Sequence, residues 1–144
     1  MNLIKNKILV TGGAGNIGSA LVEKLISDPD NFVVIIDNLS TGFLSKLPSS
    51  KLTTWAFNHD DVTHLNDLSS VMLSFHFDNV FHFAAVVGVI RTQENPIDVL
   101  NDIDGIKNIL NLSKNTSVKH VYFLQVLKYM ASRLSFHKTN IVRL

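Results

Sequence analysis

Apolar residues along the chain form either short continuous runs or stretches in which they recur every three or four positions. Continuous runs rich in β-branched residues are typical of strands buried on both faces of a sheet, and the longer spacing is typical of amphipathic helices. The runs predict strands at 7–10, 32–36, 52–57, 79–83 and 118–124. The periodic stretches predict helices at 16–27, 65–75 and 96–112, with a loop at 38–50.

Each predicted helix has an apolar face that we expect to pack against a sheet. In the first helix this face consists of Ile17, Ala20, Leu21, the stem of Lys24, and Leu25. In the second it consists of Leu65, Leu68, Val71, Met72 and Phe75. In the third it consists of Ile97, Leu100, Ile103, Ile106, Ile109 and Leu110. Because strands alternate with helices, the chain is predicted to form right-handed βαβ units and a parallel sheet with helices on both faces.

Length and composition fit one folded domain. The chain has 144 residues, of which 46% are hydrophobic and 17% are charged. Its net charge is +1 and its basic residues are scattered, so nucleic acid is not an expected partner. Cysteine is absent, which excludes disulfides and thiolate chemistry, and no metal site is predicted. The apolar stretch at the N-terminus is too short for a membrane span, so a cytoplasmic protein without a membrane partner is expected.

The first predicted strand leads into a glycine-rich segment, residues 12–18, that opens the first helix. Its glycines Gly12, Gly15 and Gly18 leave room for a pyrophosphate, which needs backbone N–H groups aimed at it and no Cβ in the way. The helix N-terminus adds a favourable dipole. Dense glycines also occur in plain tight turns, so this segment alone does not decide between the two interpretations.

A second feature favours the nucleotide. Asp37 directly follows the strand at 32–36, about twenty residues beyond Gly18, where an acidic side chain accepts hydrogen bonds from an adenosine ribose. Its charge would repel the 2′-phosphate of NADP, so NAD is the predicted cofactor. The alternative is a solvated Asp that ends a strand. With both features in place, the predicted fold class is α/β, a Rossmann-type doubly wound parallel sheet.

Residues 11–19 and the segment 37–42 together resemble the extended short-chain dehydrogenase/reductases, and more narrowly the NAD-dependent nucleotide-sugar epimerases and dehydratases of the UDP-glucose 4-epimerase kind. The resemblance continues at 60–62, 81–85 and 105–110, and covers residues 7–124. It implies a set of cofactor-binding residues spread over these motifs. They are Gly12, Gly15, Asn16, Ile17, Gly18, Asp37, Asn38, Ser40, Thr41, Gly42, Asp61, Val62, Phe83, Ala84, Ala85 and Asn101.

Several of these residues have plainer alternatives. In the family, the counterpart of Asp61 reaches the adenine amino group, but a surface loop acid has the same sequence signature. Asn101 either supports the strand that carries the catalytic loop or is a solvated or capping residue. His82 is interpreted as a packed histidine of a buried strand rather than as a catalyst. Arg91 either reaches the pyrophosphate or forms an exposed salt bridge.

The resemblance fails where the family places its catalytic groups. Its members carry serines after the fifth strand, then a Tyr-x-x-x-Lys pair that moves the hydroxyl proton while hydride passes between sugar and nicotinamide. Here the strand at 118–124 runs directly into Gln125 without serines. Tyr129, followed by Arg133, is the one degenerate candidate, and it lies too close to the strand. Arg also differs from Lys in geometry and hydration. No catalytic residue is predicted beyond this candidate.

We interpret the failure as an internal deletion of some tens of residues between Leu124 and Val126. Residues 125–144 are then a remnant of the catalytic helix, at 127–134, and of the sixth strand, at 139–144. The one domain at 1–144 is expected to be incomplete and to lack the C-terminal substrate domain. The deletion should also expose apolar surface near Phe123, Leu124, Leu127 and Leu134.

Three functions remain open at this point. The first is the NAD-binding domain of an active enzyme that transfers hydride between NAD and a UDP- or dTDP-sugar. The second is a residual module that binds NAD without turnover, and the third is a truncated gene product. The nucleotide-sugar would be a partner only if its site were intact, and a homo-oligomer is a further candidate partner.

Overall fold

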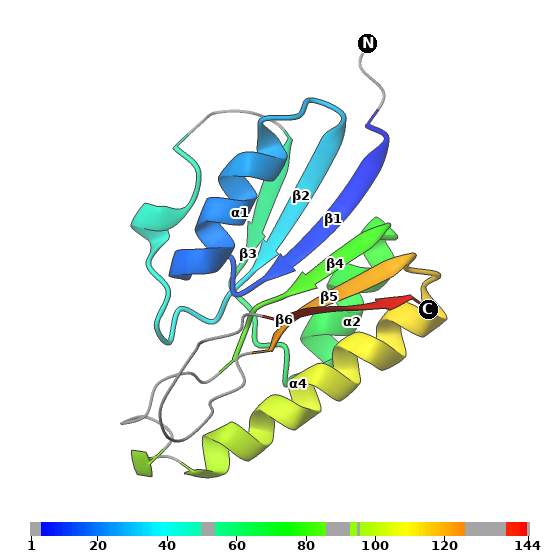
Figure 1. Ribbon diagram of the computed structural model, residues 1–144. Coiled ribbons are helices and arrows are strands. Elements are labelled where there is room, and N and C mark those ends of the chain that lie inside the picture. The colour runs from blue at the N-terminus through cyan, green and yellow to red at the C-terminus, as the bar shows by residue number, and fades with distance from the viewer. Residues whose placement is uncertain (1–3, 50–53, 86–92, 95, 126–137, 144) are drawn as a thin grey trace.

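The computed structural model describes residues 4–49, 54–85, 93–94, 96–125 and 138–143 (Figure 1). Six strands form one sheet in the order β3-β2-β1-β4-β5-β6. The strands are β1 (Asn6–Thr11), β2 (Asn31–Ile36), β3 (Trp55–Asn58), β4 (Asn79–His82), β5 (His120–Gln125) and β6 (Lys138–Arg143). The helices are α1 (Asn16–Ile26), the short 3-10 helix η1 (Leu44–Lys46), α2 (Leu65–Phe75) and α4 (Pro96–Asn115).

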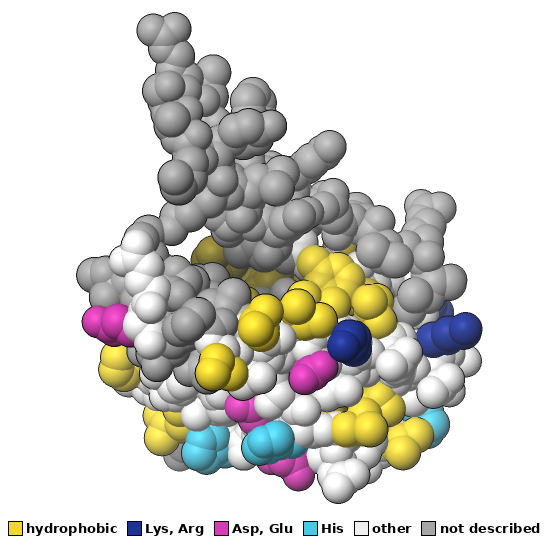
Figure 2. All heavy atoms as spheres, turned by 90° about the horizontal axis from the view of Figure 1, so that it is seen from below, with side chains coloured by type: hydrophobic (Ala, Val, Ile, Leu, Met, Phe, Trp, Pro, Cys, Tyr) yellow, Lys and Arg dark blue, Asp and Glu magenta, His cyan; other side chains and the backbone are white. Residues whose placement is uncertain are grey.

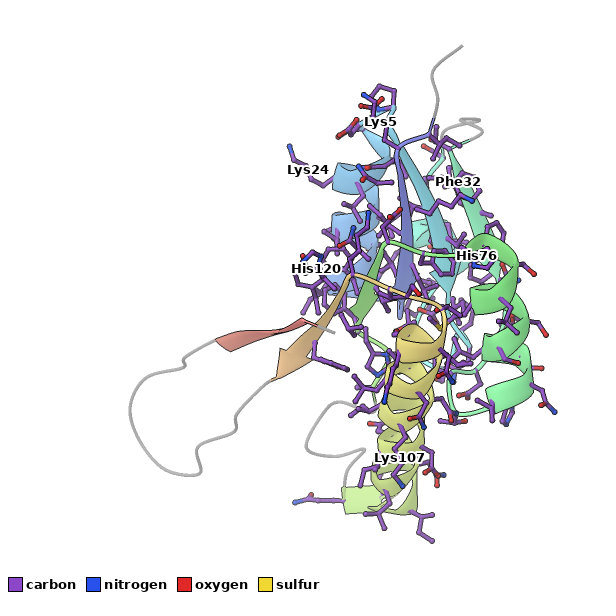
Figure 3. All side chains as sticks on the ribbon, turned by 90° about the vertical axis from the view of Figure 1, so that its right-hand side faces the viewer. Lys5, Lys24, Phe32, His76, Lys107 and His120 are labelled. Atoms are coloured by element: carbon purple, nitrogen blue, oxygen red, sulfur yellow. The ribbon has the colours of Figure 1, made fainter. Side chains whose placement is uncertain are left out.

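Strands β1 to β5 are parallel to one another, and the chain reverses its direction of growth at the centre of the sheet. From β1 it adds β2 and β3 on one side, then crosses back and adds β4 and β5 on the other. Figure 3 shows α1 on one face of the sheet and α2 with α4 on the opposite face. This confirms the predicted doubly wound α/β fold. It also places a switch point between the carboxyl ends of β1 and β4, where such folds bind ligands.

Each face of the sheet has its own apolar core. Under α2 and α4 the core includes Leu9, Leu68, Met72 and Ile109, none of which is exposed. Under α1 it contains residues of β1, β2 and α1, namely Ile8, Val10, Val22, Ile26, Val33 and Ile35. Both cores draw on the continuous runs of β1 and β2, as expected for strands buried on two sides.

The predicted inward face of α1 is wrong by about one position. Its buried residues are Gly18, Val22 and Ile26, whereas Ile17 is 56% exposed. The reason is Gly18, where a Cβ would lie 2.1 Å from the backbone oxygen of Gly12. Because Gly18 has no side chain, the helix turns this position toward the sheet. The apolar period therefore predicts the helix, but it does not predict which face of the helix packs against the sheet.

The predicted core stripe of α4 is wrong over the first half of the helix. Ile109 is fully buried, but Ile97, Leu100, Ile103 and Ile106 are 37% to 71% exposed. The cause is the position of the helix, because its N-terminal half extends past the carboxyl edge of the sheet (Figure 1). Seen from below, apolar side chains gather on this side of the molecule (Figure 2). We call Ile97, Leu100, Ile103 and Ile106 the α4 stripe.

The last strand differs from the parallel continuation that the resemblance implies. Strand β6 pairs with β5 antiparallel, with Val121 opposite Val142. A parallel return requires a crossover of at least about a dozen residues, usually with a helix, and the linker 126–137 is barely that long. Tyr129, Arg91 and the predicted helical remnant at 127–134 lie outside the described residues. So do Leu127 and Leu134, whereas Phe123 is partly buried against the core under α2 and α4.

The predicted loop at 38–50 contains the single turn η1. The described helices include none that is long and apolar enough to cross a membrane.

Candidate functional site

A cleft of about 730 Å³ opens at the switch point, where the carboxyl ends of β1, β2, β3 and β4 meet. Every cofactor-binding residue predicted from the sequence lines it except Gly42. The cleft also has lining residues that the sequence reasoning did not select. These are Ile36, Lys46, Asp60, Thr63 and Asp102. The topology therefore brings together segments that are far apart in the chain. The volume is in the range of small-molecule and cofactor sites.

The glycine-rich turn lies directly against the end of β4. Gly12 has a φ of +71°, and a Cβ there would lie 2.7 Å from the backbone of both Phe83 and Ala84. No side chain caps the N-terminus of α1, whose N-cap residue is Gly15. The first N–H groups of a helix have no partner within the helix, so those of Asn16, Ile17 and Gly18 remain available at the cleft. The turn thus has the open backbone and the helix dipole that a pyrophosphate needs.

Asp37 ends β2 and is buried, with 7% of its surface exposed. Its Oδ2 accepts a hydrogen bond from the Ala14 N–H at 2.9 Å, and its Oδ1 accepts one from the Leu39 N–H at 2.8 Å. The alternative of a solvated Asp is therefore wrong. The side chain joins the glycine-rich turn to the loop after β2, and its remaining lone pairs can accept the hydroxyl groups of a ribose.

Gly42 lies behind Asp37 rather than in the cleft lining. A Cβ at Gly42 would lie 2.8 Å from Asp37 Oδ1 and 2.9 Å from the Ala14 Cβ. The loop after β2 therefore folds closely over the turn, and Phe43 continues this contact by donating its N–H to the Ala14 carbonyl at 3.1 Å. The structure gives Gly42 the role of shaping the site.

Asp61 connects the loops that follow β2 and β3. Its Oδ2 accepts from Asn38 Nδ2 at 2.8 Å, and its Oδ1 accepts from the N–H and the hydroxyl of Thr63 at 2.9 and 2.7 Å. Partial burial acts to raise the pKa of this carboxyl, but the bonds from Thr63 and Asn38 outweigh it and lower the pKa. Asp61 is therefore an ionised acceptor, and its oxygens can accept a hydrogen bond from an amino group such as that of adenine.

The opposite wall begins with Phe83, Ala84 and Ala85, directly after β4. His82 precedes them but does not line the cleft, and its ring lies 2.8 Å from the Thr11 hydroxyl, measured from Nδ1 to Oγ1. Burial lowers the pKa of His82 to about 4. The packed-histidine interpretation is confirmed, because His82 is 6% exposed inside β4.

Asn101 and Asp102 reach the cleft from α4. The helix is attached to the same region further along its length, where Asn108 Nδ2 donates to the carbonyl oxygens of Val62 and Thr63 at 3.1 and 3.0 Å. Asn108 lies within the matched segment 105–110, but the resemblance assigned it no role at the site. Lys46 was missed as well, since it stands in a loop with no apolar period.

The residues of the cleft fit a dinucleotide. The glycine approach, the uncapped helix, the carboxylate after β2 and the ionised Asp61 occur in the order in which a pyrophosphate, a ribose and an adenine would be bound. The degenerate candidate for proton transfer, Tyr129, lies outside the described residues. The described part of the cleft is thus a binding site without an assigned catalytic group.

Comparison with known proteins agrees with this geometry. The model of the NAD dependent epimerase/dehydratase family matches residues 8–126. The UDP-glucose 4-epimerase of Dictyostelium discoideum is 33% identical over 127 residues, which are 85% of this chain and 37% of that protein. The dTDP-glucose 4,6-dehydratase of Shigella flexneri is 36% identical over 112 residues, 76% of this chain and 31% of that protein.

Solved structures show the same likeness. The UDP-glucose 4-epimerase of Thermus thermophilus in complex with NAD aligns with a TM-score of 0.70 and 30% identity, over 78% of this chain and 35% of that one. The Bordetella bronchiseptica enzyme WbmG in complex with NAD and UDP aligns with a TM-score of 0.68 and 28% identity, over the same shares. The chain thus spans about a third of the length of these relatives. By sequence and by fold, it belongs to the NAD dependent epimerase/dehydratase family.

Proposed function

We propose that this chain binds NAD in the cleft at the switch point, as the dinucleotide-holding part of a nucleotide-sugar epimerase or dehydratase. The observation that carries the proposal is the contact of Gly12 with the backbone of Phe83 and Ala84, beside the buried carboxylate of Asp37. A plain tight turn does not require such an approach. The contact brings two strand ends together at the place where a dinucleotide crosses between them.

Each part of the cleft has a distinct role in this proposal. The N–H groups at the start of α1 bind the pyrophosphate, and Asp37 accepts the ribose hydroxyls. Asp61 accepts the adenine amino group, and Phe83 to Ala85 form the wall along which the cofactor lies. NAD supplies hydride acceptance when bound. The chain's own described residues bind and orient it.

A second candidate is binding without turnover, and one observation favours it. Strand β6 returns antiparallel beside β5, with Val121 paired to Val142, whereas a helical crossover of the family's kind joins strands that run parallel. In the family resemblance, that helix carries the Tyr and Lys. We therefore propose that this chain holds NAD but does not convert a UDP- or dTDP-sugar.

One preparation tests these proposals together. The full chain is titrated calorimetrically with NAD, and conversion of UDP-glucose and of dTDP-glucose is followed in the same sample. Binding without conversion supports the residual module, and conversion contradicts the deletion between Leu124 and Val126. If NAD does not bind, the proposed function is wrong.

We also propose that the protein associates with itself through the α4 stripe. The stripe consists of four large aliphatic side chains, at every third position of α4, that the described part of the chain leaves exposed. Large exposed apolar areas often mark interaction sites. We propose a cytoplasmic location as well, because NAD and the nucleotide-sugar, which take part in the family chemistry, are both polar nucleotides.

A further inference from the structure

The charge of the cleft is unusual for a site that binds an anion. Within the described ranges, its lining residues include four carboxylates, those of Asp37, Asp60, Asp61 and Asp102, and one cation, Lys46. A pyrophosphate carries two negative charges, and helix dipoles supply only partial positive charge. Among the lining residues that the structure describes, Lys46 is therefore the one side chain that can offset the charge of the ligand directly.

Lys46 is the last residue of η1, and the local structure holds its amine at the start of α1. The loop that carries it is attached to the glycine-rich turn by the hydrogen bond from the Phe43 N–H to the Ala14 carbonyl, at 3.1 Å. Its Nζ donates to Asn16 Oδ1. The same Nζ lies 5.3 Å from the centroid of the Phe43 ring. The amine is thus positioned beside Asn16, the first residue of the helix that faces the pyrophosphate.

The amine still has hydrogen-bonding capacity. An ammonium group has three N–H donors, and the Asn16 bond uses one of them. Within the described ranges, the ion pairs are formed by Lys5, His64, Lys107 and Lys119, and no carboxylate lies within 4.0 Å of the Lys46 amine. A phosphate oxygen would be a charged partner for it.

We propose that Lys46 is a phosphate ligand of the cleft and that it binds the pyrophosphate of the dinucleotide. This rests on the proposed NAD binding. The amine is held by Asn16 at the helix N-terminus, whereas the ribose region contains the buried carboxylate of Asp37. The carboxylate of Asp37 would repel a 2′-phosphate in the ribose region. The phosphate group that can reach the Lys46 amine, beside the N-terminus of α1, is therefore the pyrophosphate.

The test compares Lys46→Met with the unchanged protein in calorimetric titrations against NAD, NADP, ADP-ribose and adenosine. Loss of a charge-assisted bond should weaken NAD and ADP-ribose about tenfold or more. Adenosine has no phosphate, so its binding should not change. Raising NaCl should weaken NAD binding to the unchanged protein more steeply than to Lys46→Met. Lys46→Arg should recover most of the affinity because it keeps the charge.

Lys24→Met is the matched control. Lys24 lies in the last turn of α1, at the far end of the helix from the cleft, and points away from the sheet (Figure 3). The Lys24→Met variant should bind each of these ligands as the unchanged protein does. The melting temperatures of both variants should match that of the unchanged chain, because neither Lys46 nor Lys24 belongs to the two apolar cores.

The outcomes separate the two proposals. If NAD binds equally well to Lys46→Met and to the unchanged protein, the role of Lys46 is wrong and NAD binding stands. If Lys46→Met weakens NADP but not NAD, the lysine serves a 2′-phosphate and the pyrophosphate assignment is overturned. If the unchanged protein binds neither NAD nor ADP-ribose, both proposals fail together.

Discussion

Thr11 and His82 stand opposite each other at the carboxyl ends of β1 and β4, with the hydroxyl oxygen 2.8 Å from Nδ1 of the ring. The same hydroxyl oxygen accepts the Ala84 N–H at 3.3 Å. The hydroxyl donates its proton to Nδ1 when the neutral ring carries its own proton on Nε2, and it accepts from Nδ1 in the other tautomer. One buried contact therefore fixes the spacing between the glycine-rich turn and the wall on the other side of the cleft.

The burial of His82 predicts a loss of stability in acid. Burial lowers the pKa of His82 from 6.5 to about 4, so between these values the unfolded chain takes up a proton that the folded chain does not. As the pH falls through this window, the free energy of unfolding should decrease by about 1.4 kcal/mol per pH unit, to a total loss on the order of 3 kcal/mol. Above pH 6.5 the group has no effect on the pH dependence.

Denaturant unfolding of the unchanged chain and of His82→Gln at pH 7, 6, 5 and 4.5 measures this effect. The glutamine does not titrate, so its curve should be flatter by about the amount given above. The carboxyl groups of Asp61 and Asp78 also have lowered pKa values, so their protonation destabilises the folded protein in acid. This effect is the same in both proteins. Parallel curves would show that His82 does not titrate as described.

Gly18→Ala should damage both the fold and the site. A methyl group there would lie 2.1 Å from the Gly12 carbonyl oxygen, so α1 must move away from the turn. Overpacking of this kind costs about 1–3 kcal/mol, and displacement of the helix N-terminus should weaken NAD at least tenfold. Gly15→Ala is the milder control, because its nearest contact would be 3.2 Å. Urea unfolding and NAD titration of the two variants give the comparison. Equal behaviour would contradict the tight approach.

Asp37→Asn should lower NAD affinity about tenfold and reduce the preference for NAD over NADP. The amide keeps one oxygen for the Ala14 or Leu39 N–H but removes the charge that repels a 2′-phosphate. Asp37→Ala leaves both N–H groups without their acceptor, so it should also lower stability by about 1–3 kcal/mol. Paired titrations with NAD and NADP, with a melt of each variant, separate these effects. An unchanged preference in both variants would exclude Asp37 as the ribose ligand.

The sequence predicted those features that depend on local pattern alone. The run at 32–36 predicted a strand buried on both faces, and α2 begins and ends at Leu65 and Phe75 as its period indicated. The glycine spacing predicted the turn because only glycine allows the approach at Gly12. The inward faces of α1 and α4 were not predictable in this way. The apolar period of a helix does not say which parts of the sheet or of the glycine-rich turn the helix will pack against.

The site shows the same division. Motifs selected Asp37 and Asp61, whose neighbours in the sequence follow a pattern, and the structure places both at the cleft. Lys46 depends on a loop that folds back over α1, and no periodicity describes such a loop. Its position follows from the contacts of Phe43 and Asn16 with residues distant in the chain.

The α4 stripe gives the last prediction, which concerns association. Leu100 and Ile103 are 62% and 48% exposed, so replacing both by Ser removes little burial from the isolated chain. If the stripe is the contact between copies, the double variant should remain folded and shift toward the monomer in light scattering at matched concentration. Ile109→Ser tests the other half of the helix, where the side chain is fully buried and its loss should cost about 2–5 kcal/mol of stability. If the unchanged protein is monomeric at every concentration, or if the double variant associates as strongly, the copies do not meet through this face.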